Sequence, residues 1–82
     1  MRIIETGRMH KYFKGGIYFV RHIAEHTETG EAIVVYSKMK SDTLGILEDK
    51  VYARPYNMFI SKVDKEKYPE VEQKYRFELV ED

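Results

Sequence analysis

The sequence predicts a small antiparallel β fold, and three short apolar runs carry that prediction. The runs are Ile17 to Val20, Ala32 to Tyr36 and Val51 to Ala53. Each is rich in β-branched or aromatic residues and is followed by turn-forming residues, which is the pattern of short strands. A chain of 82 residues is near the lower size limit for independent folding. We therefore expect a single domain that spans residues 1–82.

The first half of the chain predicts two paired strands. Gly15 and Gly16 follow an aromatic pair and indicate a turn that needs positive φ. The run over residues 17–24 is too continuous for clean alternation, so we expect a long, bent strand. Residues 26–31 hold two threonines and a late glycine, which is typical of a tight turn. The strand over residues 31–38 is apolar on both faces and is expected to be central.

The middle of the chain predicts a loop, a strand and a helical turn. Residues 41–49 lose the apolar pattern and are expected to form a loop, after which residues 51–54 form a strand. Pro55 suits the first turn of a short helix because its φ is fixed and its missing N–H is not needed there. Such a helix would place Met58 and Phe59 on one side, where we expect them to plug one end of the fold.

The C-terminal third predicts a capped turn and a closing strand. Asp64 is placed to cap a short turn that runs through Lys67, before Pro69 interrupts any helix. After that turn, apolar and charged residues alternate. Tyr75, Phe77 and Leu79 would lie on one side, as in a half-buried strand.

The composition excludes several kinds of site. The chain has no cysteine, so disulfides, thiolate metal sites and thiol nucleophiles are excluded, and a cytoplasmic location is the simplest expectation. Glu5 interrupts the N-terminal run, a pattern that fits neither a signal peptide nor a membrane span. We expect no membrane partner. Charged residues make up 34% and hydrophobic residues 43% of the chain, which is typical of a globular domain.

The formal net charge is zero, but the charge is uneven along the chain. Residues 1–40 hold seven Lys/Arg and four Glu, a net of +3, whereas residues 41–82 hold seven Lys/Arg and ten Asp/Glu, a net of −3. The two halves could attract each other within one molecule or dock two copies head to tail. A strongly basic nucleic-acid-binding domain would normally show a larger positive excess.

Several separated motifs resemble one known family. They are Phe13-Lys14-Gly15, Tyr18 with Val20, the stretch 24–31, Val34-Val35-Tyr36, and Arg54-Pro55 followed by Met58-Phe59. In this order they resemble the bacterial family catalogued as domain of unknown function 1653, over most of residues 10–64. The resemblance implies a small SH3-like β-barrel. Together with the elements predicted from the residues, the expected fold is a small SH3-like antiparallel β-barrel with a short helical turn near Pro55 and a C-terminal strand. It implies no activity, cofactor or catalytic residue.

One position departs from the pattern of that family. His22 stands where the family usually has glycine. Glycine would permit a β-bulge that histidine makes harder, so the strand register around His22 is left open.

The three histidines are the obvious candidates for metal binding or acid–base chemistry. His22 and His26 would share a strand face about 13 Å apart at about 3.3 Å per residue, too far to hold one ion. We therefore expect no metal site and no cofactor. An enzyme or ligand sensor would centre on His26 with Glu25 or Glu28. As the first residue of a tight turn, however, His26 can also simply hydrogen-bond the turn backbone.

The aromatic residues are the more informative set, since the chain has seven tyrosines and four phenylalanines. The four phenylalanines, Phe13, Phe19, Phe59 and Phe77, are expected in the core.

The clearest candidate site joins three tyrosines to one arginine. If Tyr36 and Tyr52 lie on neighbouring strands with Arg54 and Tyr56 alongside, they form an aromatic and cationic surface. Such a surface could stack a base, hold a proline-rich peptide or cage a cation. Alternatively, Arg54 pairs with a carboxylate of the 48–49 loop and the tyrosines only rim the core.

The leading hypothesis for function is a non-catalytic recognition module. Its groove would lie between residues 41–49 and the Arg54-Pro55-Tyr56 turn and would contact a protein or peptide, or a nucleic acid. One alternative is an accessory structural domain that forms a homo-oligomer through its charged halves or a free strand edge. The other is the ligand sensor or small enzyme centred on His26.

Overall fold

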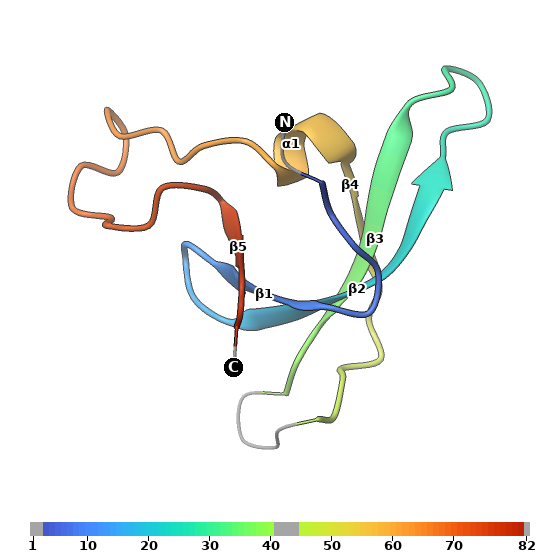
Figure 1. The fold of residues 1–82 in the computed structure, drawn as a ribbon, viewed down its shortest axis with the longest axis horizontal. Helices are drawn as coiled ribbons and strands as arrows, with labels where there is room; N and C mark the ends of the chain where they lie inside the picture. Colours follow the sequence, from blue (N-terminus) through green and yellow to red (C-terminus); the bar gives the residue numbers. More distant parts are fainter. Residues whose placement is uncertain (1–2, 41–44, 82) are drawn as a thin grey trace.

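The computed structural model describes residues 3–40 and 45–81. In these residues the fold is mainly β, with one antiparallel sheet of five strands and one short helix (Figure 1). The elements are β1 (Met9–Tyr12), β2 (Ile17–Glu25), β3 (Ala32–Lys38), β4 (Tyr52–Pro55), α1 (Tyr56–Phe59) and β5 (Phe77–Leu79). The strand order is β4-β3-β2-β1-β5. The predicted β class is confirmed, and β3 is a central strand as expected.

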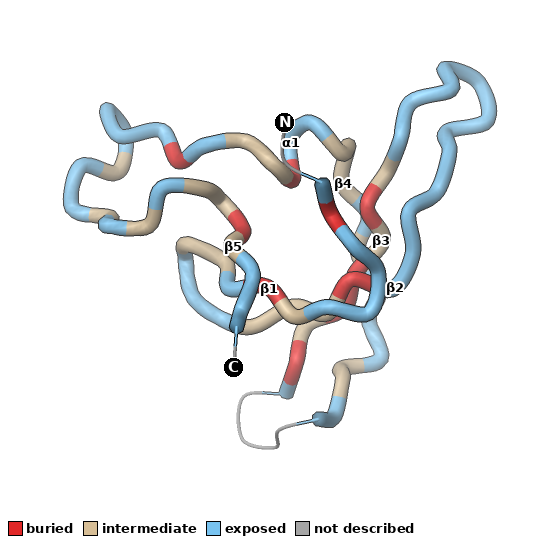
Figure 2. Tube along the Cα trace, viewed as in Figure 1, coloured by how far each residue is buried: buried red, intermediate tan, exposed pale blue. Residues whose placement is uncertain are grey.

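The β2–β3 hairpin closes at the predicted turn. The backbone N–H of His26 donates to the Glu31 carbonyl at 2.8 Å, and the Gly30 N–H donates to the His26 carbonyl at 2.8 Å. Gly30 has φ of 75°, which is the left-handed conformation expected of a glycine that closes a turn. The outer half of the hairpin extends away from the rest of the molecule (Figure 1) and is exposed (Figure 2).

A β-bulge interrupts β2 beside the unusual histidine. Val20 pairs with Tyr36 and His22 pairs with Val35, so Arg21 is the extra residue. The strand register around His22, which the sequence left open, thus contains a bulge with histidine at that position. None of the described non-glycine residues has positive φ, so this bulge needs no glycine. Its structural effect is to bend the strand and strengthen the local twist.

The sheet is not closed, so the implied barrel is not confirmed. Strands β4 and β5 are the two outer members of the sheet order. The chain between them crosses through α1 and makes an isolated bridge between Lys62 and Tyr75. Beside that bridge, the Arg76 N–H donates to the Ser61 carbonyl at 2.9 Å. The open side of the sheet is thus spanned by a short ladder and not by direct pairing of β4 with β5.

Met58 and Phe59 were both predicted to close one end of the fold, and the prediction is correct for one of them. Phe59 is fully buried, but Met58 is 46% exposed. Because successive residues of a helix point about 100° apart, a helix as short as α1 cannot turn both side chains toward the core. Pro55 ends β4 and directly precedes α1, so it fixes the direction of the chain where the strand becomes helical.

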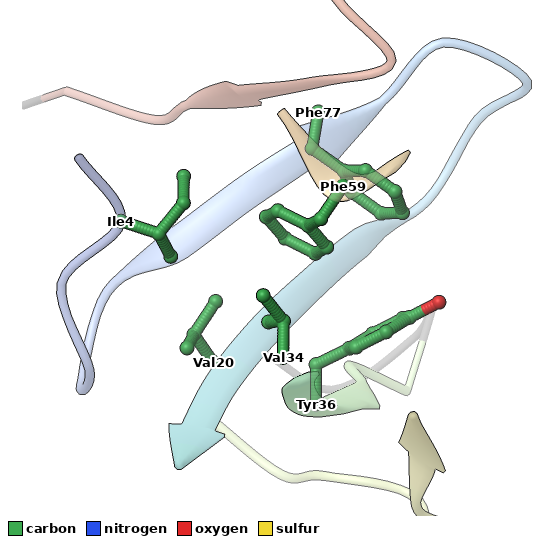
Figure 3. Close-up of a cluster of buried hydrophobic side chains, with 6 residues drawn as sticks. All are labelled: Ile4, Val20, Val34, Tyr36, Phe59 and Phe77. Carbon is green, nitrogen blue, oxygen red and sulfur yellow. The ribbon is translucent and has the colours of Figure 1, made fainter. Parts of the chain in front are cut away.

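The core is an aromatic and aliphatic cluster between the sheet and α1 (Figure 3). Its buried members are Ile4, Val20, Val34, Tyr36, Phe59 and Phe77. The rings of Phe59 and Phe77 stack with centroids 4.1 Å apart and planes at 6°. Tyr36 meets both rings edge to face, at 5.4 Å and 5.5 Å. These contacts join β3, α1 and β5 into one packed unit.

The other expected core positions are less buried. Phe13 and Phe19 are only half-buried. On the closing strand, Phe77 is buried but Leu79 is 39% exposed. Tyr75 precedes β5 and lies in the bridge with Lys62. Of the three residues predicted to share one side of the last strand, only Phe77 is fully buried.

Candidate functional site

The structure places Tyr36 in the core and not on a surface. Its exposure is 4% because β3 is central and α1 covers it. Tyr52 lies on the neighbouring strand β4 and stacks on Tyr36 with ring centroids 5.7 Å apart. Tyr18 meets both rings edge to face, at 5.5 Å and 6.2 Å. The two tyrosines are neighbours, as predicted, and half-buried Tyr52 belongs to the rim of the core.

Tyr56 and His26 each accept hydrogen bonds from backbone N–H groups, Tyr56 from a distant part of the chain and His26 from its own turn. The Tyr56 hydroxyl accepts a hydrogen bond from the Ile4 N–H at 2.7 Å and so holds the N-terminal segment. The His26 Nδ1 accepts from the N–H groups of Glu28 at 3.2 Å and Thr29 at 3.4 Å. The turn that holds His26 is at the far end of the β2–β3 hairpin (Figure 1). The structure does not bring His26 together with the tyrosines and Arg54.

Of the predicted site residues, Arg54 lines a groove in the structure. The predicted groove was to lie between residues 41–49 and the turn at residues 54–56. Of the predicted loop wall, residues 41–44 lie outside the described residues. Within the described part of the chain the one ion pair is Arg8 with Glu5 at 3.4 Å, so Arg54 is not paired with Glu48 or Asp49. The Arg54 guanidinium instead lies over the rings of Tyr12 and Phe77, with Cζ 5.7 Å and 5.4 Å from their centroids.

We call this hollow the basic aromatic groove. It has a volume of about 290 Å³ and is lined by Tyr12, Phe13, Lys14, Arg54, Met58, Asp64, Lys67, Tyr68 and Arg76. These residues come from three separate parts of the chain. They are the β1–β2 turn, the β4–α1 junction and the long connection between α1 and β5.

Cations and aromatic rings alternate around the basic aromatic groove. The Lys14 Nζ lies 5.3 Å from the Tyr68 ring centroid and 5.7 Å from the Phe13 centroid. Lys67 directly precedes Tyr68 in the chain, and its Nζ lies 5.6 Å from the Tyr68 ring centroid. These are cation–π distances, at which the ring stabilises the cation without neutralising its charge.

Among the described residues, carboxylates do not balance the positive charge of the groove. Four of the lining residues are cations and one, Asp64, is an anion. The Asp64 Oδ1 accepts from the backbone N–H groups of Glu66 at 3.0 Å and Lys67 at 3.4 Å, as predicted for a turn cap. Its negative charge is therefore partly satisfied by backbone donors, and none of the four cations forms an ion pair with a described carboxylate.

Two pKa shifts follow from this geometry. Hydrogen bonding to Lys14 is the main cause that lowers the pKa of the Tyr68 hydroxyl, and the same contact raises the pKa of Lys14. The ammonium group favours the phenolate, and the phenol oxygen favours the ammonium. Lys14 of the β1–β2 turn and Tyr68 of the 64–68 turn are thus electrostatically coupled neighbours, with the Lys14 Nζ 5.3 Å from the Tyr68 ring centroid.

Of the nine residues that line the groove, the sequence analysis named only Arg54 as a site residue. The eight that it missed include Lys14, Lys67, Tyr68 and Arg76. A weak signal exists, because Phe13-Lys14 and Lys67-Tyr68 are both adjacent pairs of an aromatic residue and a lysine. Such pairs are common in solvated turns. Nothing in their spacing indicates that two pairs more than fifty positions apart in the sequence share one groove.

The remaining features of the surface are simpler. A second hollow of about 250 Å³ is lined by apolar and polar residues of the N-terminal part of the chain, with Leu79 from β5. The N-terminal residues are Ile3, Ile4, Glu5, Arg8 and His10. Residues 3–40 and 45–81 hold no cluster of three or more histidine or carboxylate side chains suited to a metal ion. No helix in the same residues has the length and apolar character needed to cross a lipid bilayer.

The chain was also compared with known proteins. Neither the curated proteins nor the solved structures gave a match. A family model described as protein of unknown function (DUF1653) matches residues 8–79 and so includes every residue of the basic aromatic groove. Because the match covers most of the chain, the protein is a member of the DUF1653 family, whose function is unknown.

Proposed function

We propose that this protein is a non-catalytic recognition module that holds an anionic partner in the basic aromatic groove. The observation that carries the proposal is the grouping of Lys14, Arg54, Lys67 and Arg76 around one hollow of about 290 Å³, where none of them forms an ion pair with a carboxylate of residues 3–40 or 45–81. Grouped cations on a low-dielectric aromatic floor attract anions more strongly than the same cations spread over a surface.

The kinds of group that line the groove support binding more than catalysis. Lysine and arginine side chains supply N–H donors and fixed charge, and the rings of Tyr12, Phe13 and Tyr68 supply apolar faces. Arginine in particular offers a planar fork of donors that matches carboxylate and phosphate groups. In this proposal Arg54 orients the partner, while Tyr36 and Tyr52 support the strand that carries it.

We also propose that the SH3-like barrel is the architecture behind this groove. The ladder that joins residues 61–63 to residues 74–76 supports it, with the Val63 N–H donating to the Lys74 carbonyl at 2.8 Å. Residues 61–63 follow α1 and pair through this ladder with residues 74–76. Residues 74–76 lead into β5, which pairs with β1. The same path carries Lys67, Tyr68 and Arg76 to the groove.

Titration with inorganic pyrophosphate, followed by nuclear magnetic resonance of the backbone amides, tests the proposed function. We expect saturable shifts centred on the amides of Phe13, Lys14 and Tyr68. The substitution Lys14→Glu should weaken binding about tenfold, since it replaces a charge-assisted contact by a repulsive one.

The matched control is Lys50→Glu, because the Lys50 Nζ also lies over a tyrosine ring, 5.3 Å from the Tyr52 centroid, but outside the groove. It should bind pyrophosphate as the unaltered protein does. Equal losses in both variants, or shifts spread evenly over surface lysines, would contradict the proposal.

A further inference from the structure

We infer that the anionic partner is a single-stranded nucleic acid, with its phosphates on the groove cations and a base against the rings of Tyr68 and Phe13. This inference rests on the proposed function and adds the class of ligand. It is carried by the interleaving of rings and cations, because a site for phosphate alone needs no rings. Proteins that bind single strands combine a positive groove for the backbone with aromatic side chains on which bases stack.

The rings of the groove form a connected set. Tyr12 and Phe13 meet edge to face at 5.0 Å, and Phe13 meets Tyr68 edge to face at 5.0 Å. Tyr12 stacks on buried Phe77 at 4.7 Å, which anchors the set to the core. Phe13 and Tyr68 are both half-buried, so each residue keeps part of its surface accessible at the groove. The Lys14 and Lys67 side chains are long enough to move from the Tyr68 ring to a phosphate.

The size of the groove favours one unit of a flexible strand over a rigid duplex. A volume of about 290 Å³ is just below the range of about 300–1,000 Å³ found for small-molecule sites. Duplex DNA is read by a helix or a two-stranded ribbon that enters the major groove, and its paired bases do not offer their faces. A single strand can turn one base toward a recessed ring.

The charge distribution predicts a salt dependence. Since the chain has no net charge, attraction comes from the groove itself, where four cations and one carboxylate leave a local charge of +3. About three phosphate contacts on a single strand give a slope of about −2 for log affinity against log salt. Raising the salt from about 50 mM to about 200 mM should then weaken binding about 20-fold.

Fluorescence anisotropy with a labelled oligouridylate of about 12 nucleotides, within the usual site sizes of single-strand binders, tests the inference. The comparison ligands are a duplex, a polyphosphate and a phosphopeptide of similar charge. We expect the single strand to bind most tightly. Tyr68→Ala should weaken its binding about tenfold, and Tyr68→Phe should bind more tightly than Tyr68→Ala because it keeps the ring.

Charge variants complete the test. Lys14→Glu should reduce both the affinity and the magnitude of the salt slope, the latter by about one. Lys50→Glu, outside the groove, should change neither. Circular dichroism spectra of all variants should match that of the unaltered protein, and Tyr68→Phe provides a ring comparison if Tyr68→Ala loses its fold.

The outcomes separate the two proposals. If polyphosphate or the phosphopeptide binds at least as tightly as the oligonucleotide, or if Tyr68→Ala and Tyr68→Phe bind equally, the inference is overturned and the groove remains an anion site. If no anion, pyrophosphate included, responds to Lys14→Glu, the proposed function is overturned as well.

Discussion

At the scale of single residues, Tyr36 and Arg54 divide the roles that the sequence analysis assigned to one surface. Tyr36 is packed in the core, where its hydroxyl points away from the other five labelled side chains (Figure 3). Arg54 lies over the rings of Tyr12 and Phe77 and lines the groove. Burial raises the pKa of the Tyr36 hydroxyl, and the nearby charge of Arg54 opposes that shift without cancelling it.

The raised pKa of Tyr36 predicts a loss of stability in alkali. Unfolded tyrosine ionises near pH 10, whereas the folded protein holds the Tyr36 proton to higher pH. The stabilising contribution is therefore complete below about pH 10 and is lost as the pH rises through the folded pKa. Urea unfolding of the unaltered protein and of Tyr36→Phe at about pH 8 and about pH 11 should show a smaller loss in the variant.

Other titrating groups are common to both proteins in that comparison. Burial also raises the pKa of Tyr18, and Lys14 lowers the pKa of Tyr68, which acts in the opposite sense. The effect of Tyr68 cancels in the difference between Tyr36→Phe and the unaltered protein. Tyr18 contacts Tyr36 at 5.5 Å and Tyr36 is one cause of its raised pKa, so Tyr36→Phe also reduces the Tyr18 shift, which makes the loss of stability in the variant smaller still. An identical loss of stability in both would show that Tyr36 ionises at an ordinary pKa in the folded state.

At the scale of single elements, α1 shows how far a local pattern can be interpreted. Pro55 correctly indicates where the helical turn begins, and the neighbouring apolar residues Met58 and Phe59 suggest a shared face. Only the packing of α1 against β3 and β4 decides which of the two enters the core. The β2–β3 hairpin was predicted more completely, because its turn is specified locally by Gly30 and the threonines around it.

The unequal burial of Met58 and Phe59 predicts unequal costs of truncation. Phe59→Ala removes a ring stacked on Phe77 at 4.1 Å and should cost about 3–5 kcal/mol. A domain of this size has a total stability of about 4–12 kcal/mol, so this variant should be largely unfolded or close to it. Met58→Ala, at a 46% exposed position, should change stability by about 0.5 kcal/mol or less.

Thermal unfolding followed by circular dichroism measures both variants. Met58→Ala is the matched control, because it removes a large side chain from the same four-residue helix. Similar destabilisation by the two substitutions would show that Met58 also packs in the core, in conflict with its exposure.

At the scale of the whole molecule, the basic aromatic groove depends on the long connection between α1 and β5. Lys65 holds this connection in shape by donating from its Nζ to the carbonyls of Val71 and Gln73. The Gln73 side-chain amide donates to the Lys11 carbonyl at 2.8 Å and to the Tyr75 carbonyl at 2.9 Å. These bonds attach the connection to β1, and with it the turn that carries Tyr68.

Gln73→Ala should loosen this attachment without changing the charge of the groove. Loss of the side-chain bonds to Lys11 and Tyr75 should cost about 1 kcal/mol, which corresponds to about fivefold faster local opening. Native-state hydrogen exchange should report this at the amides of Val63 and Arg76, which bond across the 61–63 and 74–76 ladder. Unchanged exchange at these two amides, or equal acceleration throughout β2 and β3, would contradict a local role for Gln73.

The charge pattern shows why the groove could not be found from the sequence. Residues 41–82 carry a net charge of −3, yet they supply three of the four groove cations, Arg54, Lys67 and Arg76. A count over half of the chain averages these cations with ten carboxylates, and of the described ones only Asp64 lines the groove. Only the fold sorts the charges in space, by bringing the two turns of the groove together beside β4.

The sequence by itself determined the β class, the hairpin over β2 and β3, the turn at Gly30, the cap at Asp64 and the start of α1. These features depend on residues within a few positions of one another, where backbone preference and side-chain alternation are decisive. The tertiary structure alone decided that Tyr36 is core, that Met58 is exposed and that Lys14 meets Tyr68. Those outcomes depend on which distant segments share space, and that is set by packing of the whole chain around Phe59 and Phe77.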